Sequence, residues 1–163
     1  MYLKHYRKLL KELQKAVEEV YGERLVTLAV FGSVGRGTPR PDSDVDLLII
    51  AADLPHGRVK RVREFDLAEE KLEPIIEEMR RDGIETCLSP VIKEPGEVMQ
   101  GSLLFLDMLD DALILYDKDG FFQRFLADLR EKLKSLGAKK VYRGGAWFWV
   151  LKDDYEPGEV FEI

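Results

Sequence analysis

The stretch of sequence that decides the fold is FGSVGRGTPRPDSDVDLLII, residues 31–50 of a chain of 163. It joins two apolar, β-branched runs, residues 24–31 and 45–52, which are typical of buried strands. Gly32 lacks a Cβ atom, so a bulky polyanion can approach the backbone there. Ser33 can donate its hydroxyl, and a helix beginning at this residue would present free N–H groups to a phosphate. The stretch therefore predicts two strands joined by an anion-binding loop.

Two carboxylates, Asp44 and Asp46, stand at the start of the second run. Because residues i and i+2 of a strand share a face, both side chains are expected to point into the same space. Neighbouring anionic carboxylates repel each other unless cations neutralise them. Hard oxygen ligands of this kind suit Mg²⁺ bound together with substrate phosphates. The pair therefore predicts a site for metal and phosphate.

Three other interpretations compete for this loop. Residues 32–37 have the glycine spacing of a P-loop, but the lysine required after the second glycine is missing. An EF-hand is disfavoured because Leu47 occupies the position that requires glycine. The twelfth position of the loop, which requires glutamate, is Asp53. For any single aspartate, a polar turn or a cap is the simplest explanation. The whole combination favours the metal–phosphate site.

The combination resembles a known signature. Gly32-Ser33, the Arg36-Gly37 pair and Asp44-Val45-Asp46-Leu47 ahead of an apolar strand are similar to the motif of the nucleotidyltransferase superfamily that includes DNA polymerase β. The short length is similar to the minimal, single-domain members, many of them archaeal or bacterial. The motif covers about twenty residues, and the order of elements up to about residue 92 is compatible with that fold.

The resemblance implies a reaction. A nucleoside monophosphate, AMP from ATP being the expected case, would move from a nucleoside triphosphate to a hydroxyl of a protein or small molecule, with pyrophosphate leaving. Gly32 and Ser33 would hold the β- and γ-phosphates, and Asp44 and Asp46 would hold two Mg²⁺ ions, with Mn²⁺ as a substitute. Arg36 would either add positive charge at the triphosphate or brace the loop against Asp42 or Asp44.

Active members of the superfamily generally have a third carboxylate on a later strand, which shares a metal ion and accepts the proton of the acceptor. Glu85, early in the predicted strand 84–92, is the candidate for this role and for a third metal ligand. By alternation it shares a face with Cys87 and Ser89. If Glu85 is instead a solvated residue at the strand end, the protein would bind nucleotide but transfer it poorly.

Periodicity gives the remaining organisation. It predicts helices over residues 3–20, 58–81, 97–109 and 121–136, a strand over 112–116, and two strands around Gly144-Gly145. Pro74 is expected to kink the second helix or divide it in two. The predicted class is α/β (α+β), a small mixed sheet flanked by helices in one nucleotidyltransferase domain, with a core of about residues 1–116 and a C-terminal α/β elaboration of about 117–163.

Composition excludes several classes of protein. With 45% hydrophobic and 34% charged residues the chain is not disordered. One cysteine and two histidines exclude a disulfide framework and argue against Cys- or His-based metal centres, so carboxylates would have to hold any metal. No apolar run reaches the roughly 18 residues that cross a bilayer, and no signal-peptide core is present, so a cytoplasmic protein is expected. The lack of Asn and the abundance of Lys, Arg and Glu suit a thermophile.

Charge and length bear on partners. The net charge is −6, which argues against a long nucleic-acid track, and the length leaves no room for appended RNA-binding domains. Trp147 and Trp149 are expected to pack in a core or a subunit interface rather than stack on bases, and a homodimer is compatible with this. The alternative function, again implied by the resemblance, is an antitoxin-like nucleotide-binding module that masks or modifies a helical partner of the HEPN type with little free turnover.

Overall fold

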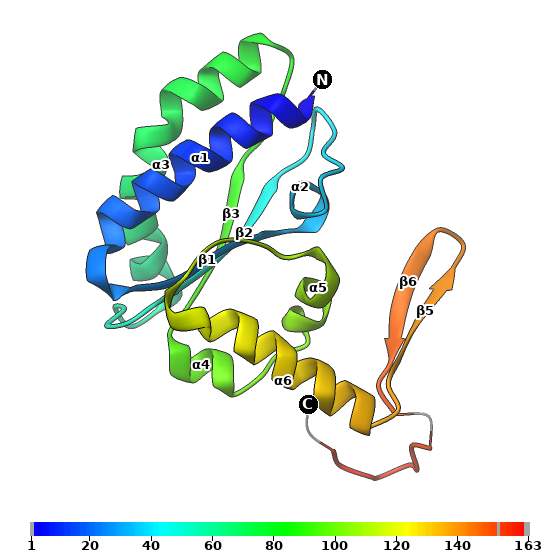
Figure 1. Cartoon of the computed structure of the whole chain (residues 1–163). Coiled ribbons are helices and arrows are strands. Elements are labelled where there is room, and N and C mark those ends of the chain that lie inside the picture. Colours follow the sequence, from blue (N-terminus) through cyan, green and yellow to red (C-terminus); the bar gives the residue numbers. More distant parts are fainter. Residues whose placement is uncertain (1, 153, 162–163) are drawn as a thin grey trace. The chain divides into compact units, whose positions relative to one another are not determined.

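The computed structural model describes residues 2–152 and 154–161 and divides into two compact units, residues 1–121 and 122–163 (Figure 1). The first unit contains the predicted loop and its two strands. The second contains a helix and a two-stranded hairpin. No helix among the described residues is both long and apolar enough to span a bilayer.

The first unit is built on a four-stranded mixed sheet of order β3-β2-β1-β4. Its strands are β1 (Leu25–Phe31), β2 (Val45–Ala51), β3 (Leu88–Lys93) and β4 (Leu113–Asp117). β1 pairs antiparallel with both β2 and β4, whereas β2 pairs parallel with β3. Its helical elements are α1 (Tyr2–Tyr21), η1 (Gly22–Arg24), α2 (Gly32–Gly35), α3 (Arg58–Arg81), α4 (Pro95–Met99), α5 (Leu104–Asp111) and η2 (Lys118–Gly120). The prediction of a small mixed sheet flanked by helices is confirmed.

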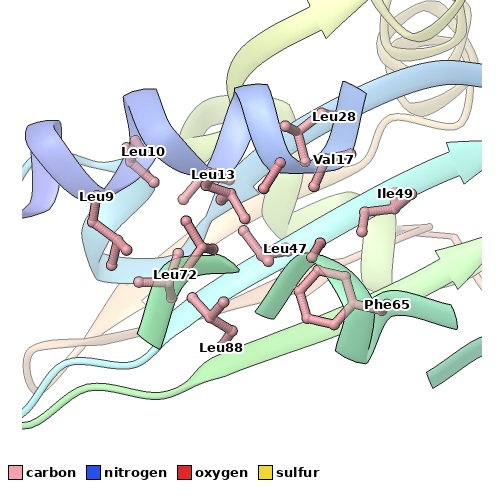
Figure 2. Close-up of a cluster of buried hydrophobic side chains, with 14 of the residues drawn as sticks. Leu9, Leu10, Leu13, Val17, Leu28, Leu47, Ile49, Phe65, Leu72 and Leu88 are labelled. Carbon is pink, nitrogen blue, oxygen red and sulfur yellow. The ribbon is translucent and has the colours of Figure 1, made fainter. Parts of the chain in front are cut away.

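The core between the sheet and the α1–α3 pair fixes which way each strand faces. Alternate residues of β2, Val45, Leu47 and Ile49, are fully buried in one cluster with the apolar stripe of α1 (Figure 2). Because side chains alternate along a strand, Asp46 lies on the opposite face of the sheet. Burial of the apolar residues therefore aims this carboxylate away from the core.

Three element boundaries differ from the sequence-based predictions. Pro74 does not divide its helix, because α3 runs without a break from Arg58 to Arg81, 24 residues in all. Pro74 is exposed, so water can bond to the carbonyl that loses its hydrogen-bond partner. The helix predicted over residues 97–109 is two helices, α4 and α5, separated at Gly101, whose φ of +81° ends the first. The strand predicted over residues 84–92 begins only at Leu88.

The second unit contains α6 (Phe121–Ser135, whose first residue closes the first unit), β5 (Lys139–Arg143) and β6 (Ala146–Val150). The two strands form the predicted antiparallel hairpin, with Arg143 opposite Ala146. Gly144 and Gly145 both have positive φ, +59° and +79°, as a tight turn between twisted strands requires. Trp147 is 38% exposed and the neighbouring Phe148 is 46% exposed, so Trp147 is not a core residue of this chain, and its packing in a subunit interface stays a prediction.

Candidate functional site

The loop after β1 begins with a glycine that no other residue can replace without strain. Gly32 has a φ of +67°, and a Cβ atom built on it would lie 2.5 Å from Oδ2 of Asp46. Both the backbone conformation and the lack of space therefore require glycine. The short helix α2 follows at once, so Gly32 brings the start of α2 and the Asp46 carboxylate into contact.

Ser33 is held by a hydrogen bond to a second serine of the loop. Its hydroxyl donates to Oγ of Ser43 at 3.0 Å, and that oxygen also accepts the N–H of Arg40 at 2.8 Å. Ser43 is 7% exposed, so these bonds lie away from water and fix the loop. The Ser33 side chain is thus placed at the start of α2, where the sequence predicted a phosphate ligand.

Two residues from distant elements fix the far end of the same loop. The fully buried Tyr6 of α1 donates its hydroxyl to the carbonyl oxygen of Ser43 at 2.8 Å and to that of Arg40 at 3.0 Å. The hydroxyl of Thr86 donates to the Ser43 oxygen at 2.7 Å. Burial, with a smaller effect of nearby aspartates, raises the pKa of Tyr6, so its hydroxyl stays protonated as a donor. The sequence placed Tyr6 only on the apolar stripe of α1.

Asp44 lies just before β2 and Asp46 lies within it, near enough for the charge of Asp44 to act on Asp46. Asp46 lies in β2 between Phe31 of β1 and Ser89 of β3. Partial burial, and then the charge of Asp44, raise the pKa of Asp46. Asp44 accepts hydrogen bonds on Oδ1 from the Cys87 thiol at 3.0 Å and, more weakly, from the Cys87 N–H at 3.3 Å. Two neighbouring carboxylates, one of them partly desolvated, form an arrangement that a bound cation would stabilise.

Glu85 does not join this pair as a third strand residue. It is exposed and precedes β3, and its N–H donates to the carbonyl of Pro41 at 2.8 Å instead of to a strand ladder. The residue of β3 beside Asp46 is Ser89. Glu85 instead lines a cavity of about 420 Å³ that it shares with Asp44. Across residues 2–152 and 154–161, no group of three or more His, Cys, Asp or Glu side chains is close enough to hold a metal ion.

Arg36 is paired with a residue that the sequence did not suggest. Its guanidinium donates to Oδ2 of Asp111 at 2.8 Å, where α5 ends, and the Asp111 side chain is only 10% exposed. A Cβ atom on Gly35 would lie 2.6 Å from the Asp111 carbonyl oxygen, so α2 and the end of α5 are in close contact. The charge of Arg36 also acts to lower the pKa of Asp46, against burial and Asp44. Arg36 therefore braces the loop while favouring the ionised carboxylate.

The loop and its two aspartates lie within the part of the chain that matches a known family. A model described as the nucleotidyltransferase domain matches residues 7–101, which is more than half of the chain and includes the loop, both aspartates and Glu85. The chain belongs to this nucleotidyltransferase family. The protein is thus an enzyme of the nucleotidyltransferase class, and the resemblance carried by the motif of residues 32–47 is confirmed.

Several known proteins are similar to this nucleotidyltransferase. One from Methanocaldococcus jannaschii, provisionally named a protein adenylyltransferase, is 30% identical over 147 residues, which cover 89% of this chain and 93% of the relative. A toxin–antitoxin crystal structure with AMP-PNP is similar at 18% identity and a TM-score of 0.49, over 77% of this chain and 87% of that one. A provisionally named nucleotidyltransferase from Sulfolobus solfataricus has 18% identity and a TM-score of 0.41, over 71% and 86%.

The donor set of this nucleotidyltransferase fits a divalent metal ion. Enzymes of this family generally use divalent metals, and the oxygen atoms of Asp44 and Asp46 are the hard ligands that Mg²⁺ prefers. Burial, and then the charge of Asp44, raise the pKa of Asp46, and a cation at the pair would offset both effects.

Proposed function

We propose that this nucleotidyltransferase moves AMP from ATP to a hydroxyl of a protein or a small molecule, in a reaction that requires Mg²⁺ held by Asp44 and Asp46. The observation that carries the proposal is the contact between Gly32 and Asp46, because it joins the start of the phosphate loop to a metal-binding carboxylate. The relative named as a protein adenylyltransferase supports AMP as the group transferred and a protein as the acceptor. The free thiol of Cys87 supports a reducing, cytoplasmic setting.

Each residue has a role in the proposed reaction. The acceptor oxygen forms a bond to the α-phosphorus, the bond from that phosphorus to the bridging oxygen breaks, and pyrophosphate leaves with its electron pair. The backbone at Gly32 and the hydroxyl of Ser33 orient the β- and γ-phosphates. Bound at the two aspartates, Mg²⁺ supplies charge neutralisation for the triphosphate and the leaving group. Glu85 is the proposed base for the acceptor proton and a further ligand if a second ion binds.

Labelled nucleotide tests this function directly. The full chain is incubated with ATP labelled at the α-phosphorus, Mg²⁺ and host extract, with Asp44→Asn, Asp46→Asn and the matched control Asp53→Asn, an exposed aspartate just beyond β2. Label on protein or small molecules that requires both site aspartates but not Asp53 is the expected result. Calorimetry should show tighter ATP binding with Mg²⁺. Equal affinity for ATP with and without Mg²⁺, or unchanged labelling by the double variant Asp44→Asn/Asp46→Asn, would overturn the proposal.

A second candidate function is favoured by the position of Glu85 outside β3. Without a third carboxylate beside Asp46, the site would bind ATP and turn it over slowly, as in an antitoxin-like module that masks or modifies a helical, HEPN-type partner. Purification from the native host distinguishes the candidates. A stoichiometric helical partner and ATP binding without pyrophosphate release favour the module, whereas a solitary protein that releases pyrophosphate favours the free enzyme.

We also propose that residues 1–163 act as one nucleotidyltransferase domain, with a core of about residues 1–116 and an elaboration of about 117–163. The family match to residues 7–101 supports the position of that core.

A further inference from the structure

The short segment just before β3 runs alongside the end of the loop that leads into β2. The N–H of Glu85 donates to the carbonyl oxygen of Pro41 at 2.8 Å, and the carbonyl oxygen of Cys87 accepts the N–H of Val45 at 2.9 Å. Backbone bonds at both ends of this segment fix its path against the loop. They hold the backbone of Cys87 beside Asp44, although the two residues are 43 positions apart in the sequence.

The side chain of Cys87 contacts the Asp44 carboxylate directly. Its thiol donates to Oδ1 at 3.0 Å, and its N–H donates to the same oxygen at 3.3 Å. Among the residues that the structure describes, no hydrogen bond or ion pair occupies Oδ2 of Asp44. The two oxygen atoms of this carboxylate therefore differ, since one is bonded within the protein and the other is left for a ligand.

We propose that Cys87 is a positioning residue, whose thiol orients the Asp44 carboxylate so that Oδ2 can bind Mg²⁺. This inference rests on the proposed function, in which Asp44 holds the metal ion. The terminal torsion of an aspartate is broad, and Asp44 is exposed, so packing alone does not fix its carboxylate. Two hydrogen bonds to one oxygen restrict that rotation. Mg²⁺ demands near-ideal octahedral geometry, so an oriented ligand favours its binding.

Two other roles for the thiol fit the structure less well. A buried cysteine would act as a small apolar side chain, but Cys87 is exposed and lines the cavity of about 420 Å³ that it shares with Asp44. A thiolate is a soft ligand, whereas Mg²⁺ favours carboxylate, carbonyl and water oxygens. Near neutral pH a thiol is ordinarily protonated. Cys87 therefore acts on the metal through Asp44, as a hydrogen-bond donor.

Vibrational spectroscopy can observe this hydrogen bond in the full chain. Cys87 is the only cysteine, so the S–H stretching band in the infrared spectrum belongs to it alone. Asp44→Ala should move this band to the higher frequency of a free thiol. Asp42→Ala is the matched control, because Asp42 is also exposed and lines the same cavity but accepts no bond from Cys87. Mg²⁺ added to the wild type should leave the band at its hydrogen-bonded position.

Metal affinity tests the consequence of the bond without any turnover. Binding of Mn²⁺ is followed by the loss of its free signal in electron paramagnetic resonance, with Mg²⁺ and Ca²⁺ as competitors. Cys87→Ala should weaken Mn²⁺ and Mg²⁺ about 10-fold, the lower end of the effect of removing a partner of a metal ligand. Ca²⁺, which accepts flexible geometry, should lose less affinity. Cys87→Ser keeps a donor and should restore most of the affinity for Mg²⁺.

The outcomes separate this inference from the proposed function. Unchanged Mg²⁺ affinity in Cys87→Ala, an equal loss for both competitors that Cys87→Ser does not restore, or a thiol band that Mg²⁺ moves to the free position would overturn the role of Cys87. If Asp44→Ala binds Mn²⁺ as tightly as the wild type, Asp44 is not a ligand, and both proposals are wrong. Circular dichroism checks folding, which the exposed positions of Cys87 and Asp44 should leave intact.

Discussion

The loop between β1 and β2 and the turn between β5 and β6 both connect antiparallel neighbours, but they position side chains in opposite ways. The first is long and fixed by side chains from α1, α5 and the segment before β3, and it brings two carboxylates together. The second is two glycines long, fixed by their backbone conformation, and its strands display cations and rings to solvent. Substitutions in the loop should therefore act by displacing the side chains of the site. Substitutions in the hairpin should act by changing the groups that its surface presents to solvent.

The largest expected effect is at Gly32. In Gly32→Ala, the new methyl group would overlap Oδ2 of Asp46 at 2.5 Å, and the positive φ would be strained. A displacement of about 1 Å at a reacting group can cost about 10²-fold in rate, so kcat/KM for nucleotide transfer should fall by about that factor. Gly37→Ala is the matched control, since its φ is +75° but no atom lies within 4 Å of the new Cβ. Equal losses in both variants would mean that backbone strain, not the contact with Asp46, is responsible.

The ion pair between Arg36 and Asp111 should have the next largest effect. Arg36→Ala removes the guanidinium from a carboxylate that is 10% exposed, and the free energy of unfolding should fall by about 1–3 kcal/mol. A thermodynamic cycle with Asp111→Ala should give a double variant less destabilised than the two single changes combined, because the pair acts as a unit. Denaturant unfolding measures these values.

The same two variants test whether Arg36 also binds the triphosphate. If it only braces the loop, Arg36→Ala and Asp111→Ala should weaken ATP binding to the same extent. A greater loss of ATP affinity in Arg36→Ala, at equal stability, would assign the second role to the guanidinium.

Acidification should stabilise the metal-free protein through Asp46. The pKa of Asp46 is raised by burial and by Asp44, so the folded protein binds a proton at pH values where the unfolded chain does not. The free energy of unfolding therefore rises as pH falls from neutral through this raised pKa. At pH 7, Asp46→Asn should raise Tm by about 1–3 °C, a small change because the group is only partly buried. The difference should shrink on acidification, and a lower Tm for the variant at pH 7 would contradict this explanation.

The smallest effect is expected in the hairpin. Phe148 is 46% exposed, so Phe148→Ser should change the free energy of unfolding by no more than about 0.5 kcal/mol, as is usual for surface positions. Phe122→Ala, at a ring that is fully buried at the start of α6, should cost about 3–5 kcal/mol. Thermal unfolding compares the two. A large loss in Phe148→Ser would show that the hairpin is packed and would remove the contrast with the loop.

Sequence predicted those parts of the site that depend on neighbours along the chain. The charge of Asp44 acts on Asp46, two residues away, and the need for glycine at position 32 follows from the approach of other groups to the backbone. The bond from Tyr6 to Ser43 and the pair of Arg36 with Asp111 join residues 37 and 75 positions apart. Local patterns carry no information on such contacts.

The predicted position of Glu85 within a strand was wrong, again because a contact between residues far apart in the sequence decides it. The apolar alternation of residues 84–92 predicts one strand, but the N–H of Glu85 is taken by Pro41, from the loop, so pairing with β2 starts only where Cys87 accepts the N–H of Val45. The catalytic role of Glu85 stays a prediction. The exposure of Trp147 could not be predicted either, because an aromatic run has the same alternation in a core and on a surface.

The outer edge of β3 has a consequence for assembly. Arg61 donates to the carbonyl of Ile92 from the side away from β2, so Ile92 and, by alternation, Pro90 direct their backbone groups to the free edge. Proline has no N–H to donate there, and the Ile92 oxygen is already occupied. The row of donors and acceptors that a strand from another molecule would need is thus interrupted twice within three residues. Copies of this protein should not extend their sheets through β3, and among the described strands the other end of the four-stranded sheet is β4.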